Sequence, residues 1–156
     1  SDWWAIDAAG VTQRACYYDD TYVFGTNGSF SNVLGADTWV EGWQSGAADA
    51  CGAPVAPHDG AASATYTYDD STGALTINGT GAYVGLPKAV NAGELPNVPV
   101  PSSVSYNVTF IDNDTITVVI EAGPGVFWTY KLIRDGAAPT TPLDGSWSIA
   151  PEAGSL

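Results

Sequence analysis

The sequence predicts an all-β protein: an antiparallel β-barrel or sandwich of about eight short strands, followed by one more strand at the C-terminus. Two observations predict this class. Short runs that alternate apolar and polar residues are separated by turns rich in Gly, Asn, Asp and Pro, and no segment has the apolar period of a strong amphipathic helix. Charged residues make up only 13% of the 156 residues, which is low for a cytosolic enzyme and suits an exported β-protein.

The alternating runs place the strands along the chain. A hairpin is predicted first, because Asn27-Gly28 supplies the positive φ angles of a type I′ turn between two such runs. Residues 6–14 are rich in Ala and predict one helical turn, while residues 45–60 and 84–101 predict irregular loops. The predicted strands span residues 16–24, 30–34, 38–44, 64–68, 74–83, 104–111, 115–121 and 126–133.

The last strand stands apart from the others. Residues 1–134 are predicted to form the barrel or sandwich module, residues 135–144 a Pro-rich linker, and residues 145–156 a C-terminal strand in which Trp147 and Ile149 share one face. Such a strand needs a sheet, in its own module or in another copy. We hypothesise that it completes the sheet of a neighbouring copy, although the linker is equally long enough to fold back onto its own module.

The charge of the chain argues against binding to nucleic acid, and its hydropathy argues against a membrane-spanning helix. Four Lys and Arg residues face 17 Asp and Glu residues, a net charge of −13. Nucleic-acid binding needs basic side chains for the phosphates, so no nucleic-acid partner is expected. No apolar run approaches the roughly 20 residues of a membrane-spanning helix, so no membrane span is expected either.

Two cysteines bear on the cellular compartment. Cys16 and Cys51 are the only ones in the chain, and we predict that they form one disulfide. The alternative is a pair of buried free thiols. A disulfide favours export, so the predicted location is extracellular or on the cell surface.

The residues that carry chemistry are few. His58, the only histidine, lies beside Asp59, but no nucleophile motif accompanies it, and we favour a loop histidine with local hydrogen bonds over a catalytic or metal-binding one. Asp112 and Asp114 lie in a predicted turn, where Ca²⁺ is a possible ligand, although Asp also favours turns for backbone reasons. No enzyme activity and no required cofactor are predicted.

Aromatic residues give another candidate site. The chain has six Trp, eight Tyr and four Phe, and exposed rings of this kind form flat platforms for sugars. Core packing is the alternative explanation for most of them. The candidates for glycan contact are Trp3, Trp4, Trp39, Trp43 and Trp128.

Five stretches together resemble a lipocalin-like β-module of exported bacterial proteins; they span residues 19–35, 39–43, 51–60, 81–91 and 147–156. Modules of that family occur in tandem and beside laminarinase-like glycoside hydrolases. The resemblance covers nearly the whole chain and implies a barrel with no enzymatic role. The order differs in one respect, because the family has the strand with Gly-x-Trp and Ala-Pro-Glu-Ala-Gly first, whereas here it comes last.

These observations predict a non-catalytic extracellular structural or adhesive module. It would be a repeat or subunit of a bacterial surface fibre, filament or adhesin, joined head-to-tail through a donated terminal strand to other copies or tandem neighbours. The alternative is a carbohydrate-binding module of a secreted polysaccharide-utilisation protein, with a glycan as its partner.

Overall fold

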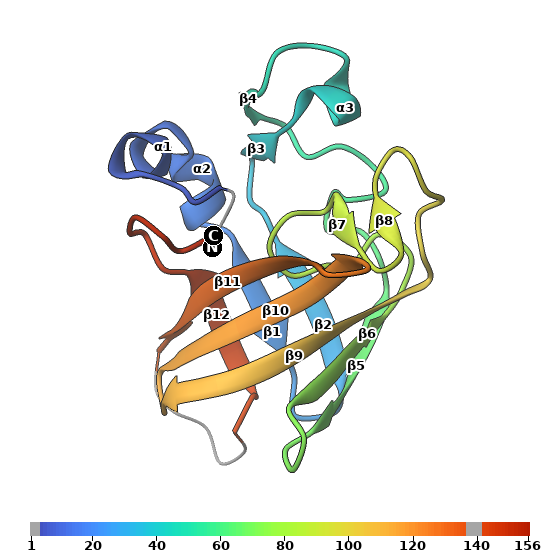
Figure 1. The fold of residues 1–156 in the computed structure, drawn as a ribbon, viewed down its shortest axis with the longest axis vertical. Helices are drawn as coiled ribbons and strands as arrows, with labels where there is room; N and C mark the ends of the chain where they lie inside the picture. The colour runs from blue at the N-terminus through green and yellow to red at the C-terminus, as the bar shows by residue number, and fades with distance from the viewer. Residues whose placement is uncertain (1–3, 137–141) are drawn as a thin grey trace.

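The computed structural model describes residues 4–136 and 142–156, and its main feature is a closed antiparallel barrel of eight strands (Figure 1). The prediction of an all-β fold is confirmed, and the barrel is the form that it takes. In order around the barrel the strands are β1 (Thr21–Phe24), β12 (Gly145–Ile149), β11 (Val126–Asp135), β10 (Thr115–Gly123), β9 (Ser103–Asp112), β6 (Ala74–Asn78), β5 (Ala64–Asp69) and β2 (Ser29–Val33).

The remaining elements gather at one end of the barrel, the upper end in Figure 1. They consist of short helices and of two small two-stranded sheets, in which β3 pairs with β4 and β7 with β8. Their bounds are α1 (Ala8–Gln13), α2 (Ala15–Tyr18), β3 (Thr38–Val40), α3 (Gly42–Ser45), β4 (Ala50–Gly52), β7 (Ala89–Val90) and β8 (Gly93–Glu94).

Large side chains fill the interior of the barrel. Along β1, β6, β10 and β11, every second residue points inward, as the alternation of a strand requires. An eight-stranded barrel is just wide enough for side chains to occupy its interior. The largest fully buried side chains include Trp147, Tyr22, Tyr130, Phe24 and Phe30. A site for a partner is therefore to be sought at the end of the barrel or on its surface.

The C-terminal strand β12 lies in the barrel of its own chain. It pairs with β1, where Tyr22 stands opposite Trp147, and with β11, where Leu132 stands opposite Ile149. The hypothesis placed this strand in a neighbouring copy, but a neighbour is not needed to complete the barrel. The physical reason is the short distance between the end of β11 and the start of β12. Asp135 of β11 pairs with Ser146 of β12, and paired strands lie about 4.8 Å apart.

Both ends of the described chain meet beside β11, as Figure 1 shows. The backbone N–H of Ile6 donates to the carbonyl oxygen of Leu156 at 2.9 Å, and that of Gly154 donates back to Ile6 at 2.8 Å. The C-terminal residues also bond to β11, because the N–H of Lys131 donates to Ser155 at 2.9 Å. The strand that was expected to stand apart is thus bonded along both of its sides and beyond its end.

Two segments predicted as strands are partly helical. The first, residues 16–24, begins as α2 and becomes β1 only at Thr21; the second, residues 38–44, begins as β3 and turns into α3. Consecutive burial is the physical reason in the first case, because Cys16 and Tyr17 are both buried and a strand facing one core buries every second residue. In the second case Glu41 closes a capping box with Gln44, which starts α3.

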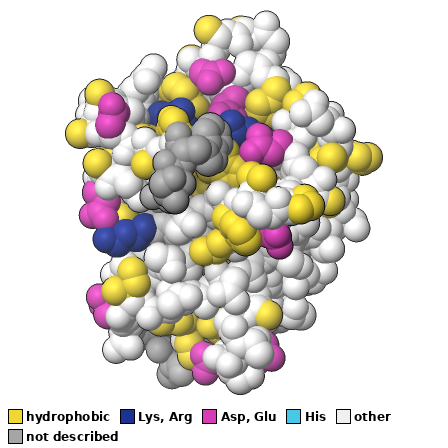
Figure 2. Space-filling view, in the orientation of Figure 1, with side chains coloured by type: hydrophobic (Ala, Val, Ile, Leu, Met, Phe, Trp, Pro, Cys, Tyr) yellow, Lys and Arg dark blue, Asp and Glu magenta, His cyan; other side chains and the backbone are white. Residues whose placement is uncertain are grey.

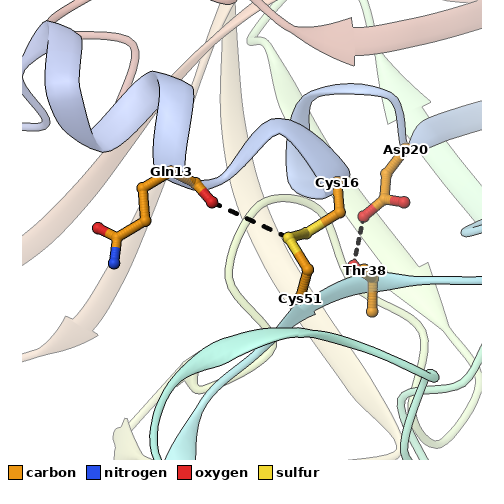
Figure 3. The surroundings of a disulfide bond; sticks show 5 residues. All are labelled: Gln13, Cys16, Asp20, Thr38 and Cys51. Carbon is orange, nitrogen blue, oxygen red and sulfur yellow. Dashed lines mark hydrogen bonds between the residues drawn. A yellow bond between two sulfur atoms is a disulfide. The ribbon is translucent and has the colours of Figure 1, made fainter.

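The disulfide between Cys16 and Cys51 is confirmed. It joins α2 to β4, and Figure 3 shows it next to Gln13, whose carbonyl oxygen lies 3.9 Å from the Cys51 sulfur. The bridge closes a separation of 35 residues, for which the chain-entropy model gives about 3–4 kcal/mol of stabilisation. It fixes the two-stranded sheet β3–β4 over the helices at the end of the barrel.

A buried carboxyl lies close to this bridge. Asp20 is buried between α2 and β1, and its Oδ2 accepts a hydrogen bond from the Thr38 hydroxyl (Figure 3). Burial raises the pKa of Asp20 to about 8; the hydrogen bond from Thr38 opposes the rise, and the nearby charges of Asp19 and Asp37 add to it. In the folded protein this carboxyl is therefore protonated at neutral pH.

The shifted pKa of Asp20 makes stability depend on pH. Between pH 4 and 8 the folded state holds a proton that the unfolded state has released, so the free energy of unfolding falls as pH rises, by up to about 1.4 kcal/mol per pH unit. Asp20→Asn retains an acceptor for Thr38 and cannot ionise. Urea unfolding at several pH values in this range should show the variant gaining stability over the wild type as pH rises. Parallel profiles for the two proteins would contradict the protonated carboxyl.

Candidate functional site

The five candidate tryptophans have different fates. Trp3 lies outside the described residues. Trp39 is in the core of the β3 region and is 6% exposed, so it has no surface for a ligand. Trp128 is 8% exposed and Trp43 is partly buried, whereas Trp4 is 39% exposed. Most of the aromatic residues therefore serve packing, and Trp4 is the indole that a ligand can cover.

Trp4 and Trp128 form the centre of a surface groove. Their ring centroids are 6.0 Å apart and their planes are inclined by 60°. One cavity of about 220 Å³ lies on the side of Phe127, which is 54% exposed, and another of about 260 Å³ on the side of Arg14 and Lys88. Both cavities are lined by Trp4 and Trp128. We call the two together the aromatic groove.

Basic side chains gather in this groove although the chain is strongly acidic. The Arg14 guanidinium lies 5.7 Å from the centre of the Trp4 ring and 4.7 Å from that of Trp39. The Lys88 ammonium lies 5.3 Å from the Trp128 ring. These are two of the four Lys and Arg residues in the chain. Figure 2 shows basic, acidic and hydrophobic side chains close together on the upper half of this face.

Acidic side chains hold the groove in shape. Glu41 uses both of its oxygens: Oε1 lies 3.2 Å from Lys88 Nζ, and Oε2 accepts from Trp43 Nε1 at 2.9 Å. Asp49 accepts from the backbone N–H of Gly42 at 2.7 Å. On the other wall, Trp128 Nε1 donates to Glu94 Oε1 at 2.8 Å. The carboxylates thus have structural partners, and the arrangement offers aromatic faces and polar edges for binding.

The residues of the groove that were not predicted from the sequence include Arg14, Glu41, Lys88 and Phe127. These four come from the end of α1, the start of α3, the loop before β7 and the start of β11. No local pattern brings such distant positions together. The one signal in the sequence was the small number of basic residues, four in the chain. The structure places two of these four beside tryptophans.

The other predicted residues do not join the groove. Asp112 and Asp114 lie in the turn between β9 and β10, where Asp112 accepts from the Asp114 backbone and Asp114 pairs with Arg134 at 3.4 Å. In the described part of the chain, the cluster with metal-ligating residue types is Cys16, Cys51 and Asp37, and its sulfurs form the disulfide. A Ca²⁺ site stays a prediction. Trp147 and Ile149 are fully buried in β12.

His58 is buried, as a loop histidine with its ring packed between aromatic neighbours. Its ring lies edge-on to Trp43, with centroids 5.8 Å apart, and to Tyr83 at 5.9 Å. The backbone N–H of His58 donates a local hydrogen bond to the carbonyl oxygen of Val55 at 2.9 Å. Burial lowers the pKa of His58, and the charge of Asp59 opposes this only in part. The imidazole is therefore neutral at pH 7.

Two further findings concern the surroundings of the protein. The disulfide indicates an oxidising compartment outside the cytosol. Within residues 4–136 and 142–156, no helix has the length and apolar character needed to cross a membrane. Comparison with protein-family models, with curated proteins and with solved structures gave no match to this chain.

Proposed function

We propose that the protein is a non-catalytic carbohydrate-binding module of an exported protein and that the aromatic groove is its binding site. The observation that carries the proposal is the exposed Trp4 ring beside Trp128, with charged side chains around it. A sugar ring has apolar faces of C–H groups and an edge of hydroxyls. Aromatic rings pack against the first, and charged or amide groups bond to the second.

The shape of the groove fits this use. Because the two rings are inclined by 60°, they form a corner in which one ring supports a sugar face and the other closes its side. Arg14 and Lys88 supply donors, and Glu41 and Asp49 supply acceptors, within the same cavity. The charges balance, which favours a neutral glycan over a strongly anionic one.

The proposed absence of catalysis rests on the state of the carboxylates. A glycoside hydrolase needs one acid and one base or nucleophile, free to reach the scissile bond. Glu41 bonds through its two oxygens to Lys88 and Trp43, and Asp49 bonds through Oδ1 to the backbone N–H of Gly42. These contacts support a positioning role for the carboxylates that line the groove.

The test is retention on immobilised polysaccharides. We expect the wild type to be retained on at least one glycan of a panel that includes laminarin, and Trp4→Ala to bind at least tenfold more weakly, a loss of about 1.4 kcal/mol. Ile111→Ala, which changes an exposed apolar residue of β9, is the control and should bind as the wild type does. No reducing ends should be released. Failure of the wild type to bind any glycan, or equal binding by Trp4→Ala, would refute the proposal.

A second function is favoured by one observation on β12. This strand alone closes the gap between β1 and β11, and it pairs with both of them. The same contacts could therefore form between copies by exchange, which would produce a head-to-tail fibre or adhesin subunit. Light scattering after size exclusion measures this directly, because exchange predicts a ladder of oligomers at high protein concentration.

A further inference from the structure

We propose that a second subsite for the glycan, which takes one neutral sugar ring, lies in a pocket between Trp43 and His58. This proposal rests on the proposed function and extends it from the aromatic groove to a neighbouring cavity. The pocket has a volume of about 330 Å³, at the lower end of the range for ligand sites. Its walls come from α3, from the loop after β4 and from the segment after β8, and they include Trp43, Gln44, Pro57, His58, Pro96 and Val98.

The lining of the pocket determines the charge of its ligand. In a chain of net charge −13, none of the residues that line this cavity is Asp, Glu, Lys or Arg. An ionic ligand would lose its hydration there without gaining a partner of opposite charge. The prolines and valines supply apolar walls, and Trp43 supplies an indole. The pocket therefore suits a neutral ligand with an apolar surface.

His58 provides the polar contact in this apolar surrounding. Its side chain is 4% exposed, and in the described part of the chain its imidazole has no hydrogen bond, only the ring contacts with Trp43 and Tyr83. A neutral imidazole has one donor and one acceptor. A hydroxyl likewise both donates and accepts, so a sugar hydroxyl matches the buried group. A bound hydroxyl would give the imidazole a hydrogen-bond partner inside the pocket.

Gln44 adds a second polar contact at the pocket wall. Its Oε1 accepts from the backbone N–H of Glu41 at 3.2 Å, which completes the capping box of α3. This bond fixes the carboxamide and leaves its amide hydrogens for another acceptor. The Gln44 amide on one wall and the His58 imidazole on another can therefore bind two hydroxyls of one sugar ring.

A chain of contacts connects the pocket to the aromatic groove. The Glu41 carboxylate binds Trp43 of the pocket with one oxygen and Lys88 of the groove with the other, and Lys88 lies over Trp128. Glu41 therefore contacts one residue that lines the pocket and one that lines the groove. We expect a glycan bound in the groove to extend past Glu41 towards the pocket, so the proposed occupant is a further sugar residue of the same glycan.

The experiment measures affinity against the length of the glycan. Oligosaccharides of increasing length, prepared from a polysaccharide that the wild type retains, are titrated by calorimetry. We expect wild-type affinity to rise once the chain is long enough to occupy both sites. His58→Phe keeps the ring volume and removes the hydrogen bonds, and it should bind the long oligosaccharides at least fivefold more weakly while leaving the short ones unchanged. His58→Gln, which retains a donor and an acceptor, should lose less, whereas Trp4→Ala should weaken binding at every length.

A second variant blocks the pocket without changing His58. Val100 lines the pocket and is exposed, so Val100→Trp should block the pocket and reproduce the loss even if His58→Phe does not fold. Wild-type affinity that does not change with length, or full affinity of both blocked variants for long chains, overturns the subsite and leaves the groove intact. If the wild type binds no glycan, both proposals fail. Competition for the pocket by an apolar dye but not by oligosaccharide would assign it to an apolar ligand and also overturn the subsite.

Discussion

Replacing Trp147 by alanine is expected to lower the free energy of unfolding by about 3–5 kcal/mol, as for other large aromatic residues removed from a core. The indole is fully buried in β12. Its ring lies 6.2 Å from that of Phe110, edge to face, and the Arg134 guanidinium lies 4.2 Å from its centre. Its Nε1 donates to the carbonyl oxygen of Leu143 at 2.9 Å. The substitution would leave a cavity and a buried carbonyl without its donor.

Two variants calibrate this measurement, which is urea unfolding followed by circular dichroism. Trp147→Phe keeps most of the ring and loses the N–H, so its loss should be smaller than that of the alanine variant. Val33→Ala alters an exposed residue of β2 and should change stability by less than about 0.5 kcal/mol. A loss below about 1 kcal/mol for Trp147→Ala would mean that β12 contributes little to the fold of its own chain.

The strands of the C-terminal half were predictable because their evidence is local. Three long alternating runs predicted the meander that became β9, β10 and β11, and Asn27-Gly28 predicted the hairpin of β1 and β2. The type I′ geometry was wrong, because Gly28 takes a positive φ but Asn27 does not, and the loop is closed by the Gly25 N–H donating to the Ser29 carbonyl oxygen at 2.8 Å. In each case neighbouring residues contain both the apolar period and the turn signal. The closure of the barrel was not predictable in this way, because it depends on pairing between β12 and β1, more than a hundred residues apart.

The candidate site was predicted only in part. The number of aromatic residues in the sequence indicated that some tryptophan side chains would be exposed. The residues next to each tryptophan did not indicate how much of its side chain would be exposed. Trp39 follows Thr38 in β3, and both are buried, although adjacent residues of a strand point to opposite sides; α2 packs against this strand and β4 pairs with it. The partners Arg14 and Lys88 are 74 positions apart in the sequence. Their meeting around Trp4 and Trp128 is a property of the tertiary fold.

Removal of residues 143–156 is expected to abolish the cooperative folding of the chain. Without β12, both β1 and β11 expose an unpaired backbone edge, and the interior loses Trp147 and Ile149. Two hydrogen bonds to Asp144, just before the strand, are lost as well; together they are called the clasp here. In that clasp the Arg134 Nη1 donates to the carbonyl oxygen of Asp144 at 2.6 Å, and the Tyr66 hydroxyl donates to the Asp144 carboxylate at 2.7 Å.

A synthetic peptide of residues 143–156 should restore folding of the truncated chain, because it brings back the paired edges and the buried side chains. A matched peptide with alanine at position 147 should not. Circular dichroism during titration with each peptide measures the difference. Cooperative unfolding of the truncated chain alone, with stability near that of the full chain, would contradict the role of β12 in the barrel.

The same peptide separates closure within one chain from exchange between chains. In the closed form, the strand of the full-length protein occupies its own gap at an effective concentration set by the short connection, in the millimolar range. Added peptide should then fail to bind, and light scattering should give the mass of a monomer at all concentrations. If the full-length protein instead forms oligomers that the peptide dissociates, β12 passes between copies. The head-to-tail assembly would then replace glycan binding as the principal function.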